Sequence, residues 1–189
     1  LASVPAPVVL GAAAGASRTA GPPGVFHLDV PSHRFDLLLV RPEATSVTLS
    51  LLAYEDLEAV VAYGSAAGTL MNQTAVQTLR AGIPAEVVLA GLKPDTAYRY
   101  QLRTRTPGGR AFPDTTEHGF HTARAPGQDF TFTLTADVHL DEHTAASVYL
   151  QSLANIESDR PDFHLDLGNL FMTDKHASRE EAGRQYLAQ

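Results

Sequence analysis

From residue 25 onward, short apolar runs alternate with turn residues along the chain. Polar and apolar positions alternate strictly in Ser46–Leu51 and again in Tyr98–Thr106, which is the period of a half-buried strand. Glycine and proline clusters, such as Pro107-Gly108-Gly109, separate the runs. The pattern predicts strands over 25–30, 35–40, 46–53, 59–63, 74–79, 85–89, 98–106 and 119–122. Short strands at this spacing are typical of an all-β sandwich.

The pattern changes after residue 129. A β-rich run over 130–135 leads into Ala136-Asp137-Val138-His139. A helix is predicted over 143–158, with Tyr149, Leu153 and Ile156 on one apolar face, because these residues lie at i, i+4 and i+7. A strand over 162–167 and a helix from about residue 177 follow. Strand, helix, strand and helix in this order predict a parallel strand pair of an α/β domain.

The composition favours a protein with a packed core, and it excludes few classes of function. Hydrophobic residues make up 44% and charged residues 19% of the chain, and the net charge is −7. This charge argues against a nucleic-acid backbone or an anionic membrane as the main partner. It leaves a phosphate substrate possible, because bound divalent cations reverse the local sign of charge. The chain has no cysteine, so any metal must be held by His, Asp, Asn or Glu.

Residues 1–24 are expected to form a flexible leader. The stretch Val4–Ala20 is small and apolar, but Pro5, Pro7, Gly11 and Gly15 interrupt it, so it is not a membrane-spanning helix. It has no basic region before it and is not an intact signal peptide. Two interpretations stay open: a mature N-terminus left by secretory cleavage, and a leader without a targeting role.

The segment Gly91–Tyr100 resembles the corner between the fifth and sixth strands of fibronectin type III domains. In such a corner, a leucine and a proline precede a tyrosine whose hydroxyl bonds back to the corner backbone. Tyr98 would be that tyrosine, after Leu92 and Pro94. The alternative is an ordinary half-buried strand tyrosine. The resemblance implies a fibronectin-III-like sandwich over 25–125, followed by a second domain over 126–189.

Metal-competent side chains follow both strands of the predicted parallel pair. Asp137 and His139 are two residues apart, so their side chains would leave the same face if strand geometry continued that far. The second strand ends in Asp166-Leu167-Gly168-Asn169, and Gly168 would allow a close approach of backbone to an ion. Ligand sites in open α/β sheets form at the carboxyl ends of the strands. Taken singly, Asp137 can instead be a turn or capping residue, and His139 a surface or core histidine.

These two segments resemble the first motifs of the calcineurin-like metallophosphoesterase superfamily. Thr135–His139 is similar to its D-x-H motif, and Leu167–Asp174 to its G-D motif. The resemblance implies that Asp137 and His139 bind one metal ion and that residue 169 bridges two. Purple acid phosphatases and related secreted bacterial phosphoesterases also place a fibronectin-like domain before the catalytic domain, and Thr122–Gly127 resembles their junction. The resemblance covers about residues 25–189 and implies a secreted or periplasmic location.

The chain departs from the family pattern in three ways. Asn169 stands where the family has its bridging Asp, and Met172 where purple acid phosphatases have an iron-binding tyrosine. The later motifs G-N-H-[DE] and G-H-x-H are absent. His118, His121 and His143 lie in the wrong context to replace them, and His164 is expected to be structural.

The leading hypothesis is a metal-dependent phosphoesterase that hydrolyses phosphate esters with two divalent ions, Fe, Mn or Zn. Asp137, His139 and Asn169 are its expected metal residues, and the α/β domain is expected to be incomplete within residues 126–189. The remainder of the catalytic domain would come from the same or a second chain. Lys175 and His176 could meet a phosphate, although a solvated loop is the favoured interpretation. The alternative is a catalytically inactive relative, or a binding module that acts through its fibronectin-like domain.

Overall fold

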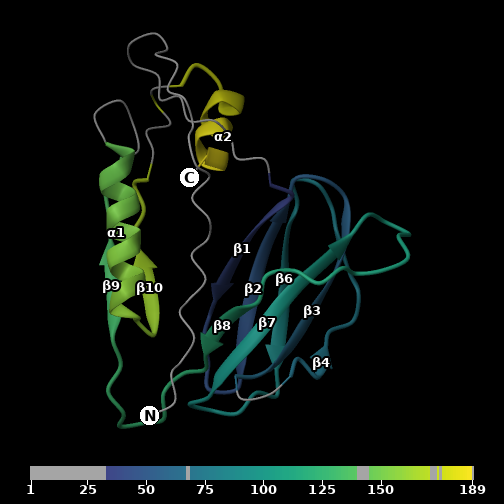
Figure 1. The fold of residues 1–189 in the computed structure, drawn as a ribbon. Coiled ribbons are helices and arrows are strands. Elements are labelled where there is room, and N and C mark those ends of the chain that lie inside the picture. The colour runs from purple at the N-terminus through teal and green to yellow at the C-terminus, as the bar shows by residue number, and fades with distance from the viewer. Residues whose placement is uncertain (1–32, 67–68, 140–144, 171–173, 175, 189) are drawn as a thin grey trace. The chain divides into compact units, whose positions relative to one another are not determined.

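A computed structural model describes residues 33–66, 69–139, 145–170, 174 and 176–188. The described residues fall into two compact units, 33–129 and 130–188 (Figure 1). The predicted leader over 1–24 and the predicted strand over 25–30 lie outside the described residues. No helix among the described residues is long and apolar enough to span a membrane.

The first unit consists of two antiparallel sheets. One sheet has the strand order β1–β2–β6, and the other has the order β4–β3–β7–β8, with β5 also pairing with β3. The strand bounds are β1 Phe35–Val40, β2 Ser46–Ala53, β3 Leu57–Ser65, β4 Asn72–Gln73, β5 Gln77–Leu79, β6 Pro84–Ala90, β7 Ala97–Arg105 and β8 His118–His121. Of the strand predicted over 74–79, only residues 77–79 form a strand, β5, which pairs with β3; the short β4 lies before the predicted range and also pairs with β3.

The alternation seen in the sequence produces the core of this unit. On β7, every second residue from Tyr98 to Thr104 is buried. Inward residues of both sheets form one apolar cluster, so burial of these side chains supplies the main driving force for folding. The cluster contains Val47, Leu49, Leu51, Ala53, Leu57, Ala59, Val61, Leu79, Val87, Leu89, Leu92, Tyr98, Tyr100 and Leu102.

The predicted tyrosine corner is confirmed. The Tyr98 side chain is 8% exposed, and its hydroxyl accepts a hydrogen bond from the backbone N–H of Lys93 at 2.8 Å. Thr122 closes the corner from the far end: its buried hydroxyl donates to the Lys93 carbonyl at 2.8 Å and accepts from the Thr96 N–H at 2.9 Å. Two side chains thus satisfy loop backbone groups that no strand pairs.

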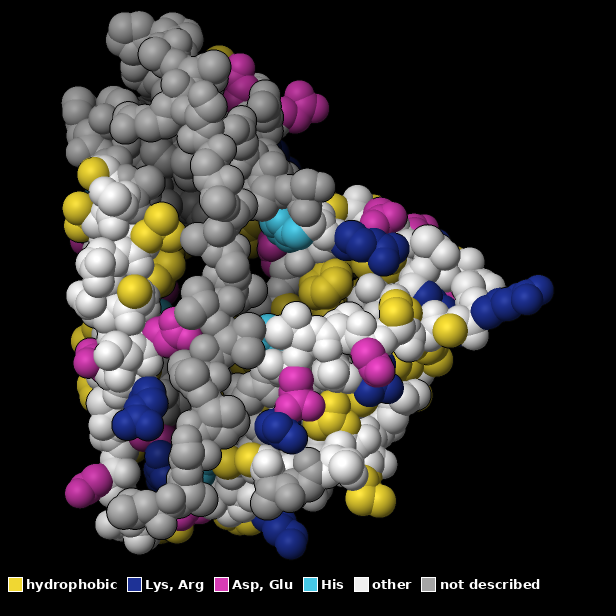
Figure 2. All heavy atoms as spheres, viewed as in Figure 1, with side chains coloured by type: hydrophobic (Ala, Val, Ile, Leu, Met, Phe, Trp, Pro, Cys, Tyr) yellow, Lys and Arg dark blue, Asp and Glu magenta, His cyan; other side chains and the backbone are white. Residues whose placement is uncertain are grey.

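Charged side chains of both signs are interspersed over the described part of the surface seen in Figure 2. On the outward face of β7, arginines alternate along the strand and pair with acidic side chains. Arg99 contacts Glu117 at 2.9 Å, and Arg105 contacts Glu58 at 2.6 Å. These pairs neutralise most of the positive charge on this face of β7.

The second unit has the element order predicted from the sequence. It contains β9 Phe132–Thr135, α1 Ala146–Asp159, β10 Phe163–Asp166 and α2 Arg179–Ala188. The two strands are parallel, with Phe163 opposite Phe132 and Asp166 opposite Thr135. Their carboxyl ends therefore lie side by side. Helix α1 ends at Arg160, which adopts a left-handed conformation with φ 48° directly before Pro161.

The two faces of this strand pair differ in character. One face carries Thr133, Thr135, His164 and Asp166. Burial and, secondly, the charge of Asp166 on this face raise the pKa of the Tyr149 hydroxyl of α1. The helical face predicted from Tyr149, Leu153 and Ile156 needs correction: Tyr149 and Ile156 are half-buried, but Leu153 is 38% exposed.

The opposite face of the pair is aromatic. Phe130, Phe132 and Phe163 stack there, with ring centroids 5.4 to 6.1 Å apart. Phe130 and Phe132 are nevertheless 58% and 47% exposed, and Leu134 is 53% exposed. Parallel sheets are normally covered on both faces, so this face is incompletely packed within the described residues.

Candidate metal centre

Residues 136–139 and 167–169 form two loops that meet at the carboxyl edge of the β9–β10 pair. Strand β9 ends at Thr135, and the backbone then turns left-handed at Asp137 (φ 56°) and at His139 (φ 41°). Strand geometry therefore does not continue to Asp137 and His139, and the condition for their side chains to leave the same face of a strand is not met. The reason lies in the partner loop, because the N–H of Asp137 donates to the Gly168 carbonyl at 3.2 Å.

The second loop is also left-handed. Gly168 has φ 86° and Asn169 has φ 59°. A Cβ atom added at Gly168 would meet nothing within 4 Å. Glycine is thus favoured here by backbone conformation rather than by lack of space. Asn is among the few other residues that tolerate this conformation.

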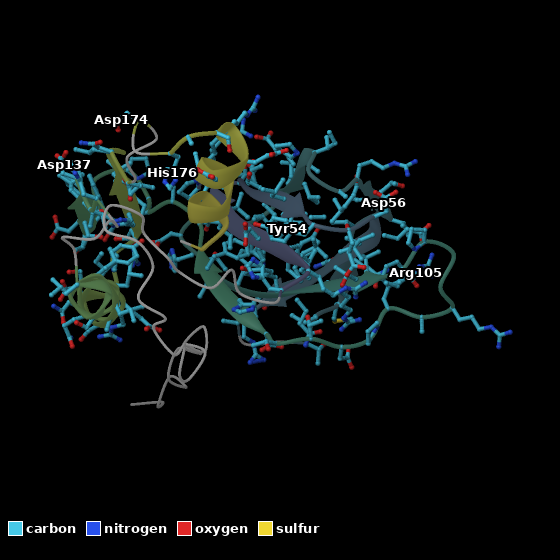
Figure 3. All side chains as sticks on the ribbon, turned by 90° about the horizontal axis from the view of Figure 1, so that it is seen from above. Tyr54, Asp56, Arg105, Asp137, Asp174 and His176 are labelled. Carbon is cyan, nitrogen blue, oxygen red and sulfur yellow. The ribbon has the colours of Figure 1, made fainter. Side chains whose placement is uncertain are left out.

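The three predicted residues converge, as the parallel topology predicts. The Asn169 amide nitrogen lies 2.5 Å from Asp137 Oδ1 and 2.7 Å from His139 Nε2. His139 Nε2 lies 3.3 Å from Asp137 Oδ1. Figure 3 shows Asp137 at the end of the strand pair. The Asp137 side chain is 69% exposed and that of His139 is 34% exposed, so the group is open to solvent.

The electrostatics of this group centre on Asp137. The hydrogen bond from Asn169 and, secondly, that from His139 hold the pKa of the Asp137 carboxyl below its ordinary value. The carboxyl is therefore ionised at neutral pH. His139 Nε2 faces both the Asp137 carboxylate and the Asn169 amide, at 3.3 Å and 2.7 Å.

One carboxylate oxygen, one imidazole nitrogen and one amide thus face a common point. If the amide turned over, its oxygen would face that point, and the three donors would suit a borderline divalent ion. No cluster of three His, Cys, Asp or Glu side chains occurs among the residues that the structure describes. The group therefore fits part of the coordination of one ion, and metal binding stays a prediction.

The other candidate residues that the structure describes belong to other elements. His118 and His121 belong to β8 of the sandwich, and His164 lies within β10, between the hydroxyls of Thr133 and Thr135. His176 is half-buried in the bend before α2. His143, Met172 and Lys175 lie outside the described residues.

Asp166 is a residue to which the sequence analysis gave no role. Its carboxylate accepts a hydrogen bond from the Gly168 N–H at 2.7 Å, inside the loop that carries Asn169. The available signal was the alternation of polar residues on the two strands, Thr133 and Thr135 on one, His164 and Asp166 on the other.

The sequence matches no family model and no curated protein. Among solved structures, the chain is similar to purple acid phosphatase PPD1 from yellow lupin (Lupinus luteus) seeds, with a TM-score of 0.55 and 15% identity over 80% of this chain and 32% of that one. It is also similar to PhoD, with a TM-score of 0.53 and 16% identity over 70% of this chain and 27% of that one.

These likenesses extend beyond the sandwich, because both cover more than two thirds of the chain. At such low identity they show a shared fold and not a shared activity. The chain spans about a third of the length of the lupin phosphatase and about a quarter of the length of PhoD. A likeness to the central fibronectin-III array of RIM-binding protein, over 55% of this chain and 37% of that one, has a TM-score of only 0.36, with 20% identity.

Proposed function

We propose that this chain contributes part of the active site of a metal-dependent phosphoesterase. Asp137 and His139 would bind one divalent ion, and Asn169 would occupy the position that bridges to a second; Fe, Mn and Zn suit these donors. The observation that carries the proposal is the convergence of these three side chains at the carboxyl edge of a parallel strand pair. The fold shared with two phosphatases agrees with it.

The chemistry that such ions supply is activation of a water molecule and neutralisation of the phosphate oxygens of an ester. The residues of this chain contribute by holding their donors in place. Asp137 is kept ionised by its hydrogen bonds, and the His139 ring presents Nε2 to the same point. Solvent exposure of the group leaves room for a phosphate ester to approach.

The proposal requires further polypeptide, from the same chain or a second one, to supply the ligands of the second ion. The exposed aromatic face of the β9–β10 pair supports this requirement. Phe132, Leu134 and Leu165 expose 47%, 53% and 44% of their surface. Water contact with so much apolar surface is unfavourable, so added secondary structure would be stabilised on this face.

A second candidate is a catalytically inactive relative, which one specific observation favours. The Asn169 amide already satisfies both Asp137 and His139 without a cation. An amide also lacks the negative charge that would offset repulsion between two bound cations. In this case the protein would act through contacts of its sandwich unit, as fibronectin-like domains commonly do.

The test is titration with Mn²⁺ of the 189-residue chain and of its Asn169→Asp variant. We expect the native chain to bind one ion weakly or not at all, and the variant to bind at least about tenfold more tightly, because a carboxylate replaces the amide. Asn155→Asp is the matched control, because it adds the same charge on an exposed position of α1.

Hydrolysis of an aryl phosphate monoester and diester is then compared between the full-length protein and its Asn169→Asp variant. A gain of activity in the variant supports the enzyme. If neither form binds Mn²⁺, the enzyme proposal is overturned. If both forms bind two ions equally tightly, the assignment of residue 169 as the limiting position is wrong.

A further inference from the structure

We propose that Asp166 is a positioning residue of the candidate metal centre: its carboxylate fixes the left-handed turn that directs Asn169 at Asp137 and His139. The inference rests on the proposed function for its chemical meaning. Its structural part, the control of the turn by one carboxylate, stands on hydrogen bonds that involve no metal ion.

The turn needs an external hold. Gly168 and Asn169 both have positive φ, at 86° and 59°, a region that L-residues other than Asn and Asp rarely adopt. The Gly168 N–H points at Asp166 Oδ1, 2.7 Å away. This side-chain-to-backbone hydrogen bond favours the turn over other conformations of the loop.

The turn at residues 168–169 also sets the position of the loop over residues 136–139. The N–H of Leu167 donates to the Thr135 carbonyl at 2.9 Å, and the N–H of Asp137 donates to the Gly168 carbonyl at 3.2 Å. The His139 N–H makes a longer contact of 3.4 Å to the Asn169 carbonyl. A shift of Gly168 would therefore displace all three side chains of the candidate centre together.

The Asp166 carboxylate is itself held from the strand pair. Thr135 Oγ1 lies 3.3 Å from Asp166 Oδ2 and 3.0 Å from His164 Nε2, and Thr133 Oγ1 lies 2.8 Å from His164 Nδ1. An ionised carboxylate only accepts, so the Thr135 hydroxyl donates to it and accepts from the His164 Nε2–H. The Thr133 hydroxyl then donates a hydrogen bond to His164 Nδ1. Thr133, His164, Thr135 and Asp166 thus form one chain of hydrogen bonds.

Two substitutions at 166 separate this role from a simple charge effect. Asp166→Asn keeps an oxygen that can accept from Gly168 but removes the charge, whereas Asp166→Ala removes both. The matched control is Asp162→Asn. Asp162 lies just before β10 and accepts from the Thr131 N–H at 2.9 Å, so this change removes a charge at the opposite end of the strand pair.

The first measurement uses no metal. Hydrogen exchange of the Gly168 amide is followed by NMR in the 189-residue chain. We expect exchange to accelerate at least about tenfold in Asp166→Ala, because the Asp166 Oδ1 acceptor of this amide is lost, and to stay within about threefold of the parent in Asp166→Asn and Asp162→Asn. Unchanged exchange in Asp166→Ala would overturn the proposal.

The second measurement is Mn²⁺ titration of the same substitutions, made in the chain that also carries Asn169→Asp. Positioning predicts at least about tenfold weaker binding for Asp166→Ala and near-parental binding for Asp166→Asn. Equal losses in both variants would assign the effect to charge and overturn the positioning role. If the native chain and the Asn169→Asp chain both fail to bind Mn²⁺, the proposed function fails, and amide exchange alone decides whether Asp166 holds the turn.

Discussion

Replacement of Tyr98 by Phe isolates one hydrogen bond of the sandwich. The phenyl ring keeps its place in the core, including the stacking on Phe120 at 5.4 Å between centroids. Only the hydroxyl that accepts from the Lys93 N–H is removed. The perturbation is therefore confined to the corner between β6 and β7.

The expected loss of stability follows from the state of the Lys93 amide. A net intramolecular hydrogen bond contributes about 0.5–1.5 kcal/mol, and a buried donor left without an acceptor costs about 1–3 kcal/mol. Because this hydrogen bond is only partly buried, water can satisfy the amide in part. We therefore expect the free energy of unfolding of the sandwich to fall by about 1–2 kcal/mol, at the lower end of the second range.

The assay is urea unfolding of the 189-residue chain followed by far-UV circular dichroism, because the chain contains no Trp to report by fluorescence. Tyr63→Phe is the control, since Tyr63 is a half-buried residue of β3 that packs on the same core. A Tyr98→Phe loss below about 0.3 kcal/mol, or one equal to the control, would refute the corner as a source of stability, because a hydrogen bond of this kind contributes more.

Three further predictions concern the tyrosine corner, the loss of stability at low pH and the folding of the second unit. Thr122→Val should destabilise the sandwich more than Tyr98→Phe in the same urea assay, because the Thr122 side chain is 2% exposed and satisfies backbone groups of two residues. The pKa of the Asp56 carboxyl is lowered, first by the Ala81 N–H and then by Arg80, so its contribution to stability is present above the ordinary Asp pKa and is lost as pH falls through the lower folded value. An NMR titration midpoint for Asp56 at or above that of an unstructured peptide would contradict this. An isolated 130–189 fragment should not unfold cooperatively as a monomer, because its aromatic face is exposed; a sigmoidal monomeric transition in urea would show the reverse.

The sequence specified the sandwich well because local and tertiary signals agree there. Alternation in Ser46–Ala53 and Ala97–Arg105 matches the buried positions of β2 and β7. Leu92 and Tyr98 form the corner that the resemblance to fibronectin type III domains implies. Where local signals are short, pairing with β3 decided the outcome: the strand predicted over 74–79 is shortened to 77–79, and an unpredicted strand forms at 72–73.

The residues of the candidate centre were predictable from the sequence, but their backbone conformation was not. Parallel strands bring their ends together, which sufficed to place Asn169 beside Asp137 and His139. Their left-handed conformations depend on hydrogen bonds between the two loops, over a separation of about thirty residues. No periodicity within either segment encodes such a contact, and the role of Asp166 was missed for the same reason.

The left-handed conformation of Asn169 has a genetic consequence. At φ 59°, Asn and Asp are the two non-glycine residues most readily accommodated, and they differ by one atom of nearly equal size. Their codons differ by a single base. One point mutation can therefore exchange an amide for a carboxylate here without rearranging the main chain. Lineages carrying this fold could thus lose or regain a charged ligand at this position in one mutational step, with the scaffold under unchanged selection.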